Sequence, residues 1–512
     1  MKQSFFCLLT LCFLIFWSSC RNDFDFRVSE GSLRFSKDTV YLDTVFSNIG
    51  SSTYTLKVYN TSTANILIPK IKLQNGPNSN YRLNVDGITG DVPLSGNEFT
   101  DVELLAKDSM YIFIETTIDI LDLVSNQTQF LYTDAIEFGQ SDPQKVELIT
   151  LVKDAVFIYP QQITNSDGNT EIETLSFDVD GDGTDEATNL QGRFLEASEL
   201  NFTNEKPYVI YGYAAVPEGE ILTIDPGARL HFHANSGLLL TNNATIHANG
   251  LPSTDSDLLE NEIIFEGDRL EPGFSEIPGQ WGTLWLYNGS TGHQFNHCTI
   301  KNSTVGIISD GNQNNPSKLL ITNTQIYNSS NFGVLGRATN IKAENLVVNK
   351  SGQSSFAATF GGNYDIVHST LANYWTNSFR QFPALLINNF TIDEDQNVVP
   401  NNLNSANFTS TTYISGTSGH SRATSTIAKF DPVAGSSASV GDNVYFKISF
   451  EGHDNGNGLH INKNSTYIER TFPAQIMCLS LINKRGNVII QAKAMPPNNK
   501  ILKNNDLKNI IY

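Results

Sequence analysis

Residues 178–186 have the spacing of a metal-binding loop. Their oxygen-bearing side chains are those of Asp178, Asp180, Asp182, Thr184 and Glu186. Ca²⁺ takes about six to eight oxygen ligands from closely spaced carboxylates and carbonyls, so this stretch predicts a structural calcium ion. Asn189 stands where a complete EF-hand loop carries its bidentate glutamate, and a solvated acidic turn is therefore the alternative.

A second group with chemical potential is the aromatic stretch 281–287. Alternation along a strand separates Leu284 and Leu286 from the aromatic side chains. We expect the leucines to point into the core and the aromatic rings to point outwards, where they can stack on sugar rings. The predicted glycan contacts are Trp281, Trp285 and Tyr287. The alternative is that residues 253–280 cover these rings as an accessory core.

Basic residues further along the chain raise the question of catalysis. Polysaccharide lyases use a basic side chain to remove a proton beside a uronate carboxylate. The candidate bases are Arg337 and Arg380, with Lys301 and Lys350 nearby. No acidic triplet accompanies them at regular steps, so binding without catalysis is the first expectation and catalysis the second.

Three histidines could suggest a metal site, since His231 and His233 fall on one side of a predicted strand and His247 follows. A tetrahedral site needs three protein ligands held by further hydrogen-bonding partners. The sequence does not supply such partners, and we expect surface histidines.

Four segments between residues 295 and 373 repeat one pattern, with an aliphatic sixth and an asparagine eighth position. The aliphatic position recurs at steps of 26, 21 and 24 residues. A variable period in the low twenties without helical periodicity predicts the coils of a parallel β-helix. The predicted interior stack is Ile300, Ile326, Val347 and Leu371, and the predicted asparagine ladder is Asn302, Asn328, Asn349 and Asn373.

Residues 220–232, Glu-Ile-Leu-Thr-Ile-Asp-Pro-Gly-Ala-Arg-Leu-His-Phe, resemble the strand–turn–strand that opens right-handed β-helices of the pectin-lyase-like group. The stretches 261–269 and 279–285 resemble a segment of bacterial surface lipoproteins with this architecture. The resemblance implies a right-handed parallel β-helix over residues 201–410 and carries no established activity with it.

The region 30–155 alternates polar and apolar residues in short runs separated by turn residues. This pattern predicts an antiparallel β-sandwich, and the region resembles the immunoglobulin-like modules of secreted bacterial proteins. We expect it to act as a spacer. Residues 156–200 are predicted to form an acidic linker or hairpin.

The N-terminus has the pattern of a signal peptide, with Lys2, an apolar run over residues 5–17 and small residues before Cys20. It resembles a bacterial lipobox, which implies a signal peptide over 1–19, lipidation of Cys20 and a tether over 20–29. The expected location is the outer membrane of a Gram-negative cell envelope, facing the surface. An ordinary secretory peptide is the alternative.

The net charge of −20 argues against nucleic acid as a partner, because nucleic-acid binding selects clusters of Lys and Arg. Residues 411–512 depart from this balance, with 11 Lys and Arg against 6 Asp and Glu. Strands are predicted at 444–450 and 487–491. We expect an irregular C-terminal region that either caps the β-helix or is partly disordered.

Together these patterns predict a lipid-anchored, all-β envelope protein that binds a glycan or another surface polymer without catalysis. A polysaccharide lyase or hydrolase is the first alternative and a structural scaffold of an envelope assembly is the second. The sequence leaves the oligomeric state open, and the only cofactor it suggests is calcium.

Overall fold

The computed structural model is all-β and divides into two compact units, Met1–Asp154 and Ala155–Tyr512. It describes residues 25–494 except 30, 32, 91–96, 124–128, 165–167, 180–181, 312–317, 379–383, 388–389, 393–397, 401–402, 416–423, 433–442, 453–467, 474–475 and 485–486. From residue 387 onwards only the backbone is described. The predicted lipidation site Cys20 and the candidate base Arg380 lie outside the described residues.

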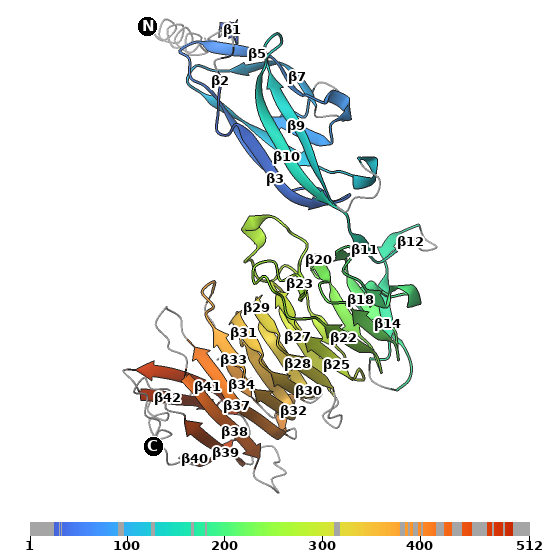
Figure 1. The fold of residues 1–512 in the computed structure, drawn as a ribbon, viewed down its shortest axis with the longest axis vertical. Helices are drawn as coiled ribbons and strands as arrows, with labels where there is room; N and C mark the ends of the chain where they lie inside the picture. Colours follow the sequence, from blue (N-terminus) through green and yellow to red (C-terminus); the bar gives the residue numbers. More distant parts are fainter. Residues whose placement is uncertain are drawn as a thin grey trace, which may run out of the picture. The chain divides into compact units, whose positions relative to one another are not determined.

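The first unit contains two sheets whose inner faces share one hydrophobic core (Figure 1). One sheet comprises β1 (Phe26–Val28), β3 (Thr39–Phe46), β5 (Asn65–Leu73), β7 (Glu98–Leu104), β9 (Gln129–Phe138) and β10 (Gln144–Lys153). The other has the order β2-β4-β8-β6 and comprises β2 (Leu33–Phe35), β4 (Tyr54–Asn60), β6 (Tyr81–Val85) and β8 (Ser109–Thr116). Burial alternates along most of these strands because successive side chains point to opposite faces.

Two strand pairs of this unit are parallel, namely β1 with β5 and β3 with β10. The prediction of purely antiparallel pairing is wrong at these pairs. Alternation of polar and apolar residues fixes which face of a strand is buried, but it does not encode the direction of the neighbouring strand.

In the second unit each strand from β15 to β27 pairs in parallel with the strand three places later in the chain, which produces three ladders. The first joins β11 (Val156–Ile158), β17 (Tyr208–Ile210), β20 (Arg229–Phe232), β23 (Ile263–Gly267), β26 (Cys298–Lys301), β29 (Gln325–Ser329), β31 (Val347–Ser351) and β33 (Thr370–Asn373). The second joins β15 (Glu186–Phe194), β18 (Tyr213–Val216), β21 (Gly237–Leu240), β24 (Leu284–Leu286), β27 (Val305–Asp310), β30 (Phe332–Glu344), β32 (Phe356–Val367) and β34 (Leu385–Ile387). The third joins β16 (Asn201–Phe202), β19 (Ile221–Ile224), β22 (Thr245–Asn249), β25 (His293–Asn296) and β28 (Leu319–Thr322), and continues into the later halves of β30 and β32.

Aliphatic and aromatic side chains from all three ladders form one buried cluster. Within it Ile300 pairs with Ile326, Ile326 with Val348 and Val348 with Leu371, each fully buried. The prediction of Val347 in this stack is wrong, because Val347 is 40% exposed and Val348 takes its place. Three consecutive apolar residues occur here, and the sequence alone does not show which of them points inwards.

The same one-residue shift alters the predicted asparagine ladder. The side-chain nitrogen of Asn328 donates a hydrogen bond of 2.8 Å to the side-chain oxygen of Asn302, and both residues are buried with φ 64°. Register places Lys350 rather than Asn349 next to Asn328, and Asn349 instead accepts hydrogen bonds from the backbone of Lys350 and Tyr374. The ladder is therefore confirmed for its first pair and wrong at Asn349.

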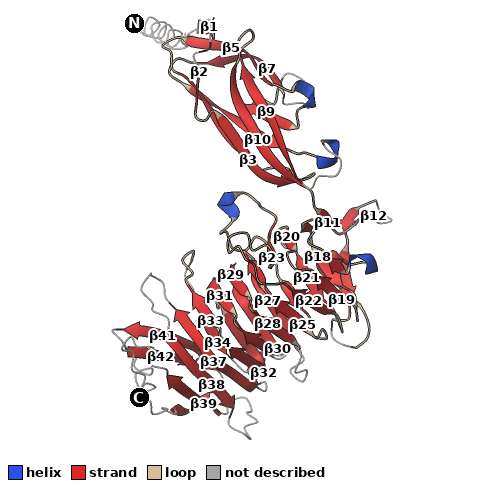
Figure 2. Cartoon of the chain, in the orientation of Figure 1, coloured by secondary structure: helices blue, strands red, loops and turns tan. Residues whose placement is uncertain are grey.

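The remaining described elements are short or lie near the C-terminus (Figure 2). They include β12 (Gln162–Thr164), β13 (Thr170–Ile172), β14 (Thr174–Phe177) and the 3₁₀ helices η1 (Gly76–Asn78), η2 (Ile120–Asp122), η3 (Ala197–Glu199) and η4 (Pro272–Phe274). No helix among the described residues has the length and apolar character needed to cross a bilayer.

The C-terminal part adds β35 (Phe390–Ile392), β36 (Val398–Pro400), β37 (Leu403–Ser415), β38 (Thr424–Pro432), β39 (Asn443–Gly452), β40 (Ile468–Pro473), β41 (Ile476–Lys484) and β42 (Asn487–Ala494). Strand β37 pairs in parallel with β32 and β33, and β38, β39 and β40 follow it in antiparallel order. Strands therefore cover both segments in which the sequence predicts them.

Candidate functional site

Three neighbouring strands of the second ladder, β18, β21 and β24, are followed by turns that carry polar side chains. These turns contain Glu218, Asn242, Asn243, Asn288 and Gly289. Because the strands are parallel and in register, the turns stack, and the amide of Asn243 donates a 3.0 Å hydrogen bond to the carbonyl oxygen of Gly289. Glycine is required at 289 because a Cβ there would overlap the side chain of Asn242.

The hairpin of β14 and β15 places the acidic loop beside these turns. Oδ2 of Asp178 accepts hydrogen bonds from the amide of Gly183 at 3.0 Å and from the side-chain nitrogen of Asn242 at 3.1 Å. At the base of the hairpin the ring of Phe177 packs edge-on against Tyr287, with 5.0 Å between ring centroids. Apolar contacts thus dock the hairpin, and its polar end lies at the turns.

A pocket of about 500 Å³ lies between the hairpin loop and the turns. Its side-chain polar groups come from Asp178, Asp182, Glu218, Asn242, Asn243, Asn288 and Tyr287. This volume lies in the range of small-molecule binding sites. Carboxylates, amides and one aromatic ring can together accept hydrogen bonds, donate them and stack on an apolar ring face, which are the contacts that a sugar needs.

Tyr287 joins the two predicted sites. Its hydroxyl donates a hydrogen bond of 2.9 Å to the carbonyl oxygen of Val179 in the acidic loop. Burial and the nearby carboxylate of Asp310 raise the pKa of Tyr287, so the phenol remains a hydrogen-bond donor at neutral pH. The sequence predicts Tyr287 as a glycan contact and the loop as a calcium site, and the structure brings both to one pocket.

Trp285 is half-buried beside Tyr287, with 5.5 Å between the ring centroids. Its indole nitrogen donates a 2.7 Å hydrogen bond to Asp310, whose two carboxylate oxygens also bind Nε and Nη2 of Arg337 at 2.5 Å each. Arg337 is therefore engaged in a bidentate ion pair. Its guanidinium holds the carboxylate that orients Trp285.

Trp281 does not face outwards, and its prediction as a glycan contact is wrong. The side chain is fully buried and stacks on Phe232 with 4.4 Å between ring centroids. Its indole nitrogen donates a 2.9 Å hydrogen bond to the carbonyl oxygen of Lys301. Alternation fails here because Trp281 makes only an isolated bridge to Ser303, and β24 begins three residues later at Leu284.

Three carboxylates of the acidic loop, those of Asp178, Asp182 and Glu186, bind backbone amides. Asp182 accepts from the amide of Thr184 at 2.8 Å, and Glu186 accepts from the amide of Val179 at 2.7 Å. Asp180 lies outside the described residues. Within the described part of the chain no three Asp, Glu, His or Cys side chains gather as a metal site, and calcium binding stays a prediction.

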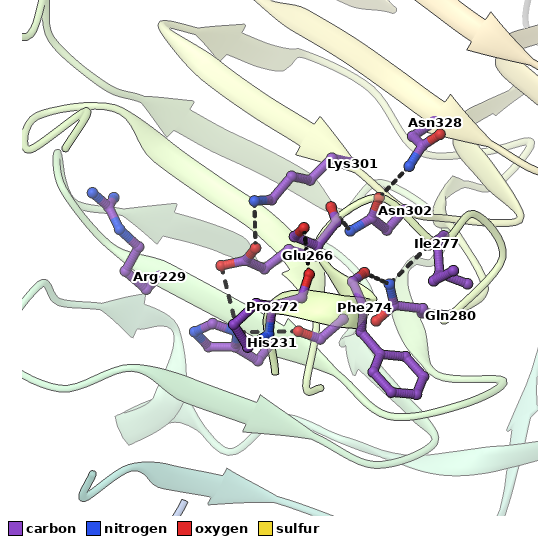
Figure 3. A network of polar contacts seen from close by, with 12 residues as sticks. Arg229, His231, Glu266, Pro272, Phe274, Ile277, Gln280, Lys301, Asn302 and Asn328 are labelled. Carbon is purple, nitrogen blue, oxygen red and sulfur yellow. Dashed lines mark hydrogen bonds and ion pairs between the residues drawn. The ribbon is translucent and has the colours of Figure 1, made fainter. Parts of the chain in front are cut away.

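A second polar cluster, the Glu266 network, runs across the first ladder (Figure 3). Glu266 forms an ion pair of 2.7 Å with Lys301, and Nδ1 of His231 lies 3.7 Å from its other oxygen. His231 is only 6% exposed, so its prediction as a surface histidine is wrong, because register places Glu266 directly beside it. His233 is partly exposed and bonds Asp268 at 2.7 Å.

Sequence reasoning missed Lys318, which is fully buried. Its ammonium donates hydrogen bonds to the carbonyl oxygens of Tyr287, Asn288 and Ser290, at 2.5, 3.3 and 2.6 Å. Burial lowers the pKa of Lys318 to about 7. Tyr287 and Asn288 line the pocket, so Lys318 fixes the turn that carries them. In the sequence Lys318 stands directly before an apolar strand. Lysines at such positions are common in surface turns, so this pattern does not distinguish a buried lysine.

Searches against protein-family models and curated proteins return no match. Among solved structures, a family 123 glycoside hydrolase from Clostridium perfringens aligns with a TM-score of 0.17 and 9% identity, over 24% of this chain and 27% of that one. An ASH/PapD-like domain of human CEP192 aligns with a TM-score of 0.15 and 12% identity, over 24% of this chain and 84% of that one. Similarities this low carry no argument about function.

Proposed function

We propose that this chain is a lipid-anchored protein of the bacterial cell envelope that binds a glycan in the pocket beside Tyr287 without catalysis. The observation that carries the proposal is the convergence of a carboxylate-rich loop, three asparagine side chains and a half-buried tyrosine around about 500 Å³. Sugars expose hydroxyl groups along their edges and CH groups on their faces. Amides and carboxylates match the former, and the ring of Tyr287 matches the latter.

The proposed scaffold is a right-handed parallel β-helix in which each coil contributes one strand to each ladder. Two features support it, namely the pairing of strands three places apart and the single core to which all ladders contribute. Right-handed connections dominate among parallel strands of one sheet. We further propose that the first unit is an immunoglobulin-like module and that Cys20 is lipidated at the outer membrane, facing the surface.

A glycan array probed with the full chain in mild detergent, with and without calcium, tests the binding proposal. Specific retention of one glycan class, lost in Tyr287→Ala and kept in Tyr159→Ala, is the expected result. Tyr159 is an exposed tyrosine of the same unit and does not line the pocket, so it is a matched control. Release of a shorter or unsaturated product from the bound glycan would favour the lyase or hydrolase instead.

The anchor is tested separately, by partition of the chain between detergent and water in cells that express it. The wild-type chain should enter the detergent phase and Cys20→Ala should remain in water. Equal partition of both chains would contradict lipidation at Cys20 while leaving the pocket proposal untouched.

A further inference from the structure

The first unit carries an exposed aromatic surface on the sheet β2-β4-β8-β6. Tyr111 and Phe113, at alternate positions of β8, are 46% and 39% exposed. Their rings lie 6.4 Å apart between centroids with an interplanar angle of 23°. The two exposed rings are nearly parallel to each other and form a platform. Most large aromatic side chains of this unit instead point into the core.

A cation lies against this platform. The ammonium of Lys57, on the neighbouring strand β4, lies 4.9 Å from the ring centroid of Tyr111 and 5.4 Å from that of Tyr59. Register pairs Lys57 with Tyr111 directly, so the contact is built into the sheet rather than made by a distant loop. Cation–π contact keeps the ammonium at the level of the rings, where it can also meet a bound anion.

Basic side chains occupy outward positions on three of the four strands of this sheet, although the whole chain carries −20. The basic residues at outward positions of the sheet are Arg34, Lys57 and Arg82. The acidic residues beside them are Glu115, which lies 4.0 Å from Arg82, and Asp86, which follows β6 and whose amide donates a hydrogen bond of 3.0 Å to the carbonyl oxygen of Tyr111. Lys57 pairs with Tyr111 and Arg34 pairs with Tyr59, so an occupant of the rings that carries negative charge gains from these two side chains.

The other outward residues of the platform strands are polar rather than aliphatic, with Thr55 and Asn84 on either side of Phe113 and Ser109 beside Tyr59. A protein partner gains most from fully desolvated apolar anchors in pockets. Flat rings bordered by hydroxyl and amide groups instead suit the alternating CH faces and hydroxyl edges of a sugar chain.

From this arrangement we propose that the outer face of β4 and β8 binds an acidic polysaccharide. Tyr111 and Phe113 stack on successive sugar rings, and Lys57 and Arg34 contact their carboxylate or sulfate groups. The first unit would then be a second binding module and not only a spacer. The proposal is independent of the pocket beside Tyr287, because no residue is shared.

Affinity gel electrophoresis of the full chain in mild detergent tests the proposal, with polygalacturonate, dextran sulfate or neutral dextran in the gel. We expect retardation by at least one of the two acidic polymers and none by neutral dextran. Tyr111→Ala combined with Phe113→Ala should weaken binding by about tenfold or more, as expected for the loss of two ring contacts. Lys57→Gln should weaken it by about threefold and reduce its dependence on salt.

Tyr41→Ala is the matched control, since Tyr41 is 62% exposed on the other sheet of the same unit. It should retain wild-type retardation. Equal retardation by neutral dextran, unchanged binding in the platform variant, or no retardation at all would overturn the proposal. So would loss of binding in Tyr41→Ala, binding to anionic lipid vesicles only, or self-association through this face in sedimentation. Circular dichroism of each variant establishes that the fold is intact.

Discussion

The hydroxyl of Tyr287 donates a hydrogen bond of 2.9 Å to the carbonyl oxygen of Val179, 108 residues earlier in the chain. This bond connects the end of a ladder strand to an acidic loop that precedes the ladder. It closes one side of the pocket, so the loop lines the pocket whether or not it holds an ion.

Loss of this connection should loosen the hairpin. In Tyr287→Phe combined with Asn242→Ala, the acidic loop loses the hydrogen bonds that these two side chains donate to it, whereas the packing of Phe177 and the pairing of β15 with β18 remain. We expect amide hydrogens of residues 182–190 to exchange about tenfold faster, which corresponds to about 1.4 kcal/mol of local opening. Mass-spectrometric hydrogen exchange measures this. Unchanged exchange would show that apolar contacts and the pairing of β15 with β18 are enough to hold the hairpin.

Arg337 should matter for stability. Arg337→Ala leaves the mostly buried carboxylate of Asp310 with Trp285 but without its ion-pair partner, and we expect a loss of about 1–3 kcal/mol in the free energy of unfolding. Arg337→Lys should recover only part of it, because an ammonium cannot bind both oxygens in the same fork. The free energy of unfolding is measured by urea denaturation followed by circular dichroism. A wild-type midpoint in Arg337→Ala would contradict a stabilising role for the ion pair with Asp310.

Lys318 predicts a pH dependence of stability. Its folded pKa of about 7 lies below the ordinary lysine value, so the unfolded chain binds more protons than the folded chain between these values. The free energy of unfolding should therefore rise from pH 7 to about pH 10. The lowered pKa of buried His293 acts in the same direction at acid pH. Lys318→Met should abolish the alkaline part of this rise, measured as the free energy of unfolding in urea at a series of pH values. An unchanged pH profile in that variant would contradict the role of Lys318.

The asparagine ladder predicts a graded series at position 328. Asn328→Ala loses the hydrogen bond to Asn302 and also forces a Cβ residue without a local hydrogen bond to adopt φ 64°, which together should cost about 2–3 kcal/mol. Asn328→Gly loses the bond but accepts the φ value, so its cost should be smaller. Thermal unfolding of the two variants measures the difference. Equal melting temperatures would show that the φ value at position 328 adds nothing to the cost of Asn328→Ala.

The sequence predicts the all-β class, the parallel strands and the first rungs of the stack at Ile300 and Ile326. It does so because an aliphatic residue that recurs at the same position of each repeat indicates a side chain that is buried in every coil. It fails at Val347 and Asn349, where the step between coils changes and neighbouring residues are equally apolar or polar. Trp281 and His231 show a second limit. Their burial depends on partners such as Phe232 and Glu266, which lie 49 and 35 residues away and are found only through register.

The pocket itself was not predictable for a similar reason. The acidic loop and Tyr287 are each visible in the sequence, but their contact depends on the way the β14–β15 hairpin returns to the ladder. The burial of Lys318 could not be predicted either. A buried lysine is recognised by the carbonyl groups that surround it and not by its neighbours in sequence.

Glycan binding in the pocket is tested most directly by the dissociation constant of the strongest array ligand for wild type and Tyr287→Ala, measured by isothermal titration calorimetry. We expect a loss of affinity of about tenfold or more in Tyr287→Ala, equivalent to about 1.4 kcal/mol, with wild-type affinity in Tyr159→Ala. Equal dissociation constants for wild type and Tyr287→Ala would contradict glycan binding in this pocket.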